Sequence, residues 1–263
     1  MKPAIGQFIP GNSILHRADP RTKILMTILY MVAVMFIKTF AGYGVAVVFL
    51  IVAVLASRIP VKYVLRSIRP LLFIILFTVI LNMFFYKGET LLWAWGIIHI
   101  YREGIIFAVK MALRIMILVT GASLLTFTTS SIALTDGLER LMSPLRVIHF
   151  PAHDIAMMMS IALRFIPTFS EETDRIMKAQ SSRGADFDTG KFIEKIRSFI
   201  PVIIPLIISA FRRAEDLAVA MESRCYRGGD GRTRFRVLKF SWNDIVVAVA
   251  VVGLTVGILA IGL

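Results

Sequence analysis

The stretch that decides the fold lies near the N-terminus. Residues Ile24–Ser57 have the sequence ILMTILYMVAVMFIKTFAGYGVAVVFLIVAVLAS, in which Lys38 is the single charged side chain. At a rise of ~1.5 Å per residue, this run would form a helix of ~50 Å, too long for one crossing of a ~30 Å hydrocarbon core. The run must therefore fold back, and Lys38 and Gly42 mark the break. We expect two short membrane spans here, at 22–37 and 41–57.

The whole chain has the composition of a membrane protein. Of its 263 residues, 57% are hydrophobic and 18% are charged, whereas in soluble domains just under half are apolar and roughly a quarter are charged. Further apolar runs predict spans at 70–86, 104–127 and 243–263. The predicted fold is therefore an all-α integral membrane protein with about five transmembrane helices, together with long cytoplasmic amphipathic coupling helices.

The positions of the basic residues predict the orientation in the cell membrane. They concentrate before the first span and after the second: Lys2, Arg17, Arg21 and Lys23, then Arg58, Lys62, Arg66 and Arg69. Positive residues in short loops stay on the cytoplasmic side, so the N-terminus is expected inside and, after five crossings, the C-terminus outside. The chain then comprises a cytoplasmic N-terminal segment (1–21), a four-helix transmembrane region (22–127), a cytoplasmic region (128–242) and a final span (243–263).

Two stretches of the cytoplasmic region are nearly as apolar as a span. Arg164 interrupts the first, Ile155–Phe169, and Pro201 and Pro205 interrupt the second, Phe199–Phe211. Apolar residues recur at steps of three and four along both. This pattern indicates long helices with one apolar face, lying against the membrane or the underside of the bundle.

The ends of these two helices form an internal repeat with a constant offset. The matching pairs are Asp174 and Glu215, Ile176 and Leu217, Ala179 and Ala220, Ser182 and Ser223, and Arg183 and Arg224. Measured from the Phe-Ile-Pro tripeptides at 165–167 and 199–201, the second arm is longer by seven residues. An arginine at a helix C-terminus can simply complement the dipole of its own helix, or its planar fork can bind a partner's carboxylate or carbonyls. Duplication of the whole context favours two docking points.

The two triplets carry a resemblance to a known family. Residues 182–184, Ser-Arg-Gly, and 223–225, Ser-Arg-Cys, each close a long amphipathic helix after several spans. They resemble the paired X-Arg-X coupling motifs, commonly Ala-Arg-Gly, in the T component of energy-coupling factor (ECF) transporters. The resemblance covers essentially the whole chain. It departs from the family pattern in the serine before each arginine and in Cys225, which stands where the first motif has Gly184.

The resemblance implies a function. In that family, the two motifs dock into grooves on two ABC-type ATPase subunits, and the coupling helices hold a substrate-binding S component in the membrane. By resemblance, Arg183 and Arg224 are the docking arginines. The chain would then be a non-catalytic subunit that links ATP hydrolysis by its partners to uptake of a micronutrient, a vitamin or metal ion.

Motifs for catalysis of its own are absent from the sequence. The nearest approach to a phosphate loop runs from Gly184 to residues 190–192, Gly-Lys-Phe, with five intervening residues and Phe in place of the hydroxyl. Neither His-Glu-x-x-His nor a Gly-x-Ser-x-Gly elbow occurs, and a single cysteine, Cys225, excludes an internal disulfide and a cysteine metal cage. We therefore expect no catalytic residue, no cofactor and no metal site. The basic run at 224–239 precedes a span, where positive-inside retention and anionic lipid are sufficient causes, so no nucleic acid is expected.

Two groups of residues have alternative interpretations. Lys110 and Arg114 form an i,i+4 pair within the fourth span. They either contact an anion or a partner, or they are structural cations bonded to backbone carbonyls, unless Lys110 snorkels outward. We favour the structural role. Met157, Met158 and Met159 are either ordinary packing or an adaptable surface for the S component. The alternative function is a stand-alone permease or channel, although no predicted span has the interior carboxylate that secondary transporters usually keep.

Overall fold

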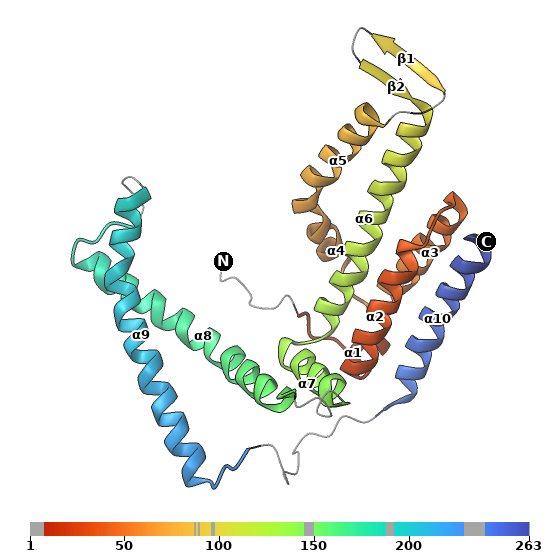
Figure 1. The fold of residues 1–263 in the computed structure, drawn as a ribbon. Helices are drawn as coiled ribbons and strands as arrows, with labels where there is room; N and C mark the ends of the chain where they lie inside the picture. Colours follow the sequence, from red (N-terminus) through yellow and green to blue (C-terminus); the bar gives the residue numbers. More distant parts are fainter. Residues whose placement is uncertain are drawn as a thin grey trace. The chain divides into compact units, whose positions relative to one another are not determined.

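The computed structural model describes residues 8–86, 88, 90–95, 98–144, 150–187, 192–228 and 240–262. Most of the basic run at 224–239 therefore lies outside the described residues, as does the Gly190-Lys191 part of the rejected phosphate loop. The chain divides into two compact units (Figure 1). We call Met1–Leu141 with Arg236–Leu263 the bundle unit, and Met142–Phe235 the arm unit.

The described part of the chain is almost entirely helical. The elements of the bundle unit are α1 (Ile14–Arg17), α2 (Pro20–Met35), α3 (Phe40–Ser57), α4 (Val61–Ile68), a 3₁₀ turn (Arg69–Leu71), α5 (Leu72–Phe85), β1 (Leu91–Trp95), β2 (Ile98–Tyr101), α6 (Arg102–Thr128), α7 (Ser131–Met142) and α10 (Trp242–Gly262). The arm unit contains α8 (Ala152–Ser182) and α9 (Phe192–Ser223). The predicted class, an all-α membrane protein, is confirmed.

Four helical segments of the described chain are long and apolar enough to cross a membrane. They are Phe40–Ser57, Val61–Phe85, Arg102–Thr128 and Trp242–Ile261. The predicted first span corresponds to α2, which has 16 residues and is therefore ~24 Å long, shorter than a ~30 Å hydrocarbon core. In place of the predicted loop at 58–69, the structure has α4, because Val64 is buried and α4 packs along α6.

The core of the bundle unit lies around α2, which packs against α6 and α10, while α3 packs against the same two helices. Tyr30, Val34, Ile117 and Leu254 are among its buried residues. The hydroxyl of Tyr30 donates a hydrogen bond to the Ile117 carbonyl at 2.9 Å. A Cβ at Gly121 would overlap the Tyr30 ring, so this close approach of α6 to α2 requires glycine.

Three helix ends are joined at one side of the bundle. The N–H of Asp19, the N-cap of α2, donates to Asp244 Oδ1 at 2.5 Å, and Asp244 Oδ2 accepts the Ser241 N–H at the start of α10 at 2.6 Å. Lys23 Nζ donates to the Thr128 carbonyl at 3.1 Å, at the end of α6. The N-termini of α2 and α10 and the C-terminus of α6 therefore lie on the same side.

Asp19 itself is held ionised at this junction. Burial alone would raise the pKa of Asp19, but hydrogen bonds from Arg21 and the charges of Arg21 and Lys23 hold its pKa below the usual range. A carboxyl with a depressed pKa stabilises the fold above its unfolded pKa and loses that contribution as the pH falls. The hydrogen bonds from Arg21 to the Asp19 carboxylate therefore make their full contribution at neutral pH.

Asp244→Ala is expected to lower the melting temperature of the purified protein in detergent. Asp244 is 3% exposed and Asp19 5%, so its removal leaves the buried Asp19 N–H without an acceptor, at a cost of about 1–3 kcal/mol. The N–H of Ser241, an exposed residue, loses its acceptor as well. Val256→Ala, on the same helix at a 60% exposed position, is the matched control. Equal melting temperatures for the two variants would contradict this account.

A β-hairpin connects α5 to α6 and was not expected from the sequence. Its strands pair antiparallel, with Trp95 opposite Ile98 and Leu91 opposite Tyr101, and an irregularity between Leu91 and Trp93. The hairpin is the only sheet in the described residues, and it lies at the end of α6 opposite the junction of α2 and α10 (Figure 1).

Candidate docking site

The arm unit is an antiparallel pair of long helices that cross each other (Figure 1). An ion pair joins the two helices, and we call it the crossing contact: Arg213 Nη2 of α9 lies 3.0 Å from Glu172 Oε2 of α8, and the Arg213 guanidinium lies 5.8 Å from the centre of the Phe169 ring. Hydrogen bonding from Ser209, and then from Arg213, lowers the pKa of the Glu172 carboxyl. The pair therefore remains ionised at neutral pH.

Further contacts hold the two ends of the pair. The rings of Phe187 and Phe199 lie 5.3 Å apart at the turn between α8 and α9. At the other end, Tyr226 Oη lies 3.4 Å from His153 Nε2. Both helices run continuously through their internal prolines, Pro167 in α8 and Pro201 and Pro205 in α9.

The crossing point joins equivalent positions of the internal repeat. The sequence separation of Glu172 and Arg213 is 41, and the same offset relates Arg183 to Arg224. Each predicted docking arginine therefore lies eleven positions beyond the crossing contact, or ~16 Å along its helix. From this contact to the arginine, the two helix segments have equal length, whereas the second is longer by seven residues when both are measured from the Phe-Ile-Pro tripeptides. Because the helices are antiparallel, the two arginines lie on opposite sides of the crossing.

The two arginines occupy identical helix caps. After α8, the Gly184 N–H donates to the Ser181 carbonyl and the Ala185 N–H to the Gln180 carbonyl, both at 3.0 Å. After α9, at the same offset, the Cys225 N–H donates to Glu222 at 2.8 Å and the Tyr226 N–H to Met221 at 3.0 Å. Both are Schellman motifs, which end a helix with one residue in the left-handed region.

The departure at Cys225 does not change this geometry. Gly184 has φ of 91° and Cys225 has φ of 56°, so cysteine adopts the backbone conformation that glycine occupies in the first motif. A side chain in this region costs about 1–2 kcal/mol, which the two cap hydrogen bonds offset. The predicted triplets, residues 182–184 and 223–225, are therefore equivalent structures.

Both arginine side chains are available to a partner. Arg183 and Arg224 are exposed, and within the described part of the chain neither side chain has a hydrogen bond or ion pair. The guanidinium groups thus present their donors outward from rigid helix ends.

One predicted docking motif lies in a concave surface. A cavity of about 680 Å³ in the arm unit lies between the first half of α8 and the end of α9, and its lining includes Met157, Arg164, Arg224, Cys225 and Arg227. Met157, predicted as an S-component contact, and Arg224, predicted as an ATPase contact, therefore line the same cavity. Met158 and Met159 do not line the cavity and are exposed.

Sequence reasoning does not identify Arg164 and Arg227 as functional residues. In the sequence, Arg164 is only an interruption of an apolar run, and Arg227 is one member of a basic segment. The one feature of the sequence that could have singled out Arg164 is its place as a lone arginine in an apolar stretch. That Arg164 shares a cavity with Arg224 follows only from the antiparallel pairing of the helices.

Lys110 and Arg114 both bond the segment that follows α2. Lys110 Nζ donates to the Lys38 carbonyl and Arg114 Nη2 to the Ile37 carbonyl, each at 2.8 Å. Lys110 Nζ also lies 5.1 Å from the centre of the Phe40 ring. These contacts tie α6 to the turn between α2 and α3. A structural role requires such bonds from the two cations to backbone carbonyls.

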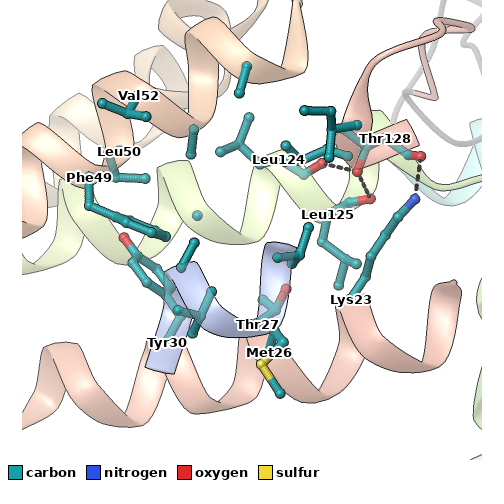
Figure 2. A pocket seen from close by; sticks show the side chains of 18 of the residues that line it. Lys23, Met26, Thr27, Tyr30, Phe49, Leu50, Val52, Leu124, Leu125 and Thr128 are labelled. Atoms are coloured by element: carbon teal, nitrogen blue, oxygen red, sulfur yellow. Dashed lines mark hydrogen bonds between the residues drawn. The ribbon is translucent and has the colours of Figure 1, made fainter. Parts of the chain in front are cut away.

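The bundle unit contains an apolar cavity of about 230 Å³ (Figure 2). Side chains of α2, α3, α6 and α10 line it, among them Phe49, Leu50 and Leu124. Figure 2 shows Lys23 at one end, bonded to Thr128, and the Tyr30 hydroxyl is bonded to Ile117. A polar cargo would need convergent polar groups, but the Lys23 ammonium and the Tyr30 hydroxyl already donate to the protein's own backbone. Within the described residues, no group of three or more His, Cys, Asp or Glu could hold a metal ion.

Comparisons with known proteins agree with this architecture. A family model described as cobalt transport protein matches residues 11–235. The chain is 57% identical to the energy-coupling factor transporter transmembrane protein EcfT of Ruminiclostridium cellulolyticum, over 92% of this chain and 91% of that protein. The chain belongs to the energy-coupling factor transporter transmembrane protein family.

Other members of this family are similar over the same extent. The EcfT protein of Thermosediminibacter oceani is 52% identical over 98% of this chain and 95% of its own length, and that of Listeria innocua is 43% identical over 95% and 94%. The chain is thus a multi-pass membrane component of an energy-coupling factor transporter.

Proposed function

We propose that the chain is the subunit that couples ATP hydrolysis by two ABC-type ATPase subunits to uptake of a micronutrient, a vitamin or metal ion, through a substrate-binding S component. The observation that carries this proposal is the pair of equivalent helix caps, each presenting an exposed arginine at the same distance along its helix from a common crossing point. Two equivalent caps at opposite ends of one helix pair suit two partners.

The ATPase contacts are assigned to the two caps. Arg183 and Arg224 supply the docking cations, while Ser182, Gly184, Ser223 and Cys225 flank them. Arginine at a rigid helix end matches a carboxylate or a set of carbonyls on a partner with little loss of side-chain freedom. Neither cap needs its arginine for an internal contact among the described residues, which supports a role in binding.

The S component is assigned to the apolar face of α9 and to the exposed Met158 and Met159 of α8, whereas the third predicted methionine, Met157, lines the arm-unit cavity. Large apolar residues of α9 at steps of three and four are exposed: Ile193, Ile196, Ile200, Ile203, Ile204, Ile207, Ile208 and Phe211. Met158 is 58% exposed and Met159 39%. Such a face needs a lipid or protein partner, and methionine adapts to partners of different shape.

Purification from membranes separates this function from a stand-alone permease. A coupling subunit should bring two ATPases and a small membrane protein with it, in a complex with ATPase activity. A permease should run alone or as a homo-oligomer, and that result would overturn the proposal. The apolar cavity of the bundle unit, in which Lys23 and the Tyr30 hydroxyl bond the protein's own backbone, also favours the coupling role.

For the orientation, we infer that residues 1–21 and 128–242 are cytoplasmic and that the C-terminus is outside. The joined ends of α2, α6 and α10 support this inference, because the two helices that follow basic sequence, α2 and α10, begin on the same side of the bundle. In intact cells, a membrane-impermeant thiol reagent should label Thr90→Cys in a Cys225→Ser background and should not label native Cys225. The reverse pattern would show that the orientation is wrong.

A further inference from the structure

The cavity of the arm unit collects three arginines from two helices. Arg164 comes from the first half of α8, Arg224 caps α9, and Arg227 follows it. Among the described residues, none of the three side chains has a hydrogen bond or ion pair, and no acidic side chain lines the cavity. Three like charges around one hollow repel one another, and an anionic occupant relieves that repulsion.

The other docking end is different in charge. At the offset of the internal repeat, Arg227 corresponds to Asp186 and Arg164 corresponds to Pro205. The three equivalent positions at the first end therefore carry one arginine, one aspartate and one proline, with no net charge, whereas the three positions that line the cavity at the second end are all arginine. The backbone caps are equivalent, and the charge is not.

We propose that Arg164 and Arg227 join Arg224 in binding a carboxylate-bearing segment of one ATPase subunit inside this cavity, so that charge decides which ATPase docks at which end. The inference rests on the proposed function, and names the chemistry of the partner surface at the second motif. A volume of about 680 Å³ falls within the range of ~300–1,000 Å³ typical of ligand pockets. It accommodates several side chains of a protein segment, and Met157 and Met221 on its wall can repack around them.

The test uses the complex in nanodiscs and measures how tightly the ATPase subunits associate with the membrane subunits, at low and high salt. The variants are Arg164→Ala, Arg227→Ala and Arg224→Ala. Each variant is expected to weaken association about tenfold and to reduce its salt dependence, since a buried charge contact is lost. Arg175→Ala is the control, because it removes the same charge from an exposed position on α8, three turns from Arg164 and outside the cavity. It should change association less than twofold.

Cys225 gives an independent readout, because the chain's single cysteine lines the cavity. Bound ATPase should slow its reaction with a maleimide, and Arg164→Ala should restore the rate. Arg164→Lys, which keeps the charge but not the planar fork, should lie between the native protein and the alanine variant.

Three results would overturn the inference. If Arg224→Ala weakens association while Arg164→Ala and Arg227→Ala behave as Arg175→Ala does, the proposed function stands and the three-arginine cavity fails. If the effects appear in nanodiscs containing phosphatidylglycerol and vanish in phosphatidylcholine alone, the occupant is a lipid headgroup. If Arg224→Ala also leaves association unchanged, the ATPase-docking function itself fails.

Discussion

Replacing Arg183 or Arg224 with glutamate is expected to weaken association with the ATPases by about 2–5 kcal/mol, the cost of breaking a charge contact in an interface. Each substitution exchanges a docking cation for a charge that the partner repels or leaves unpaired. Both arginines are exposed and make no side-chain bond within the described residues, so the chain itself should still fold. The measurement is co-purification of ATPases and transport-linked ATP hydrolysis.

The size of the effect separates docking from a merely local role. If each arginine only complements its own helix dipole, reversal costs about 0.3–1 kcal/mol of helix stability and leaves the complex intact. Arg175→Glu, at an exposed site on α8, is the matched control for charge reversal. Normal association and hydrolysis in both Arg183→Glu and Arg224→Glu would remove the basis for assigning these residues as docking points.

Inserting Gly-Gly after Ile176 or after Leu217 is expected to abolish ATP-dependent uptake while leaving ATP hydrolysis and membrane insertion. Each insertion lies four residues beyond the crossing contact of Glu172 and Arg213, between this contact and the docking cap. A continuous helix transmits a displacement of its tip, whereas glycine in a helix interior weakens the helix by roughly 1 kcal/mol per residue and introduces a flexible joint. The readout is uptake per ATP hydrolysed in a reconstituted complex.

The control is the same insertion after Asp186, between α8 and α9, which leaves both arms continuous. It should retain more coupling than either arm insertion. If both arm insertions support normal uptake, the helices do not act as levers, and the arginines serve as anchors only.

Spans of continuous apolar sequence were predictable because burial in lipid depends on length and composition alone. The second span was expected at 41–57 and α3 occupies Phe40–Ser57; the fourth was expected at 104–127 and α6 occupies Arg102–Thr128. The helix at Val61–Ile68 was missed because the basic residues within it and on either side of it suggested a loop, although Val64 is buried against the bundle.

The hairpin at 91–101 could not be distinguished by periodicity. Residues 91–101, LLWAWGIIHIY, form an apolar run with no clear alternation, which is compatible with a strand or a buried segment. Its aromatic and β-branched residues around Gly96 were the available signal for a turn between strands.

The repeat in the arm unit was visible in the sequence, but its three-dimensional consequence was not. Matching residues at a constant offset predicted two similar helix ends, and both are Schellman caps. Pairing between Glu172 and Arg213, and between Arg164 and the end of α9, depends on how the helices cross. Side chains so distant in the sequence cannot be placed together without that crossing.

The most direct measurement of the central claim is cross-linking from the two caps in the purified complex. Cysteines placed at Ser182 and at Ser223, in a Cys225→Ser background, are treated with a short thiol–amine cross-linker, with Arg175→Cys at an exposed position of α8, away from both caps, as the control. The account predicts an ATPase adduct from each cap position and little from Arg175. Absence of ATPase adducts from both caps, in a complex that still carries out ATP-dependent uptake, would contradict it.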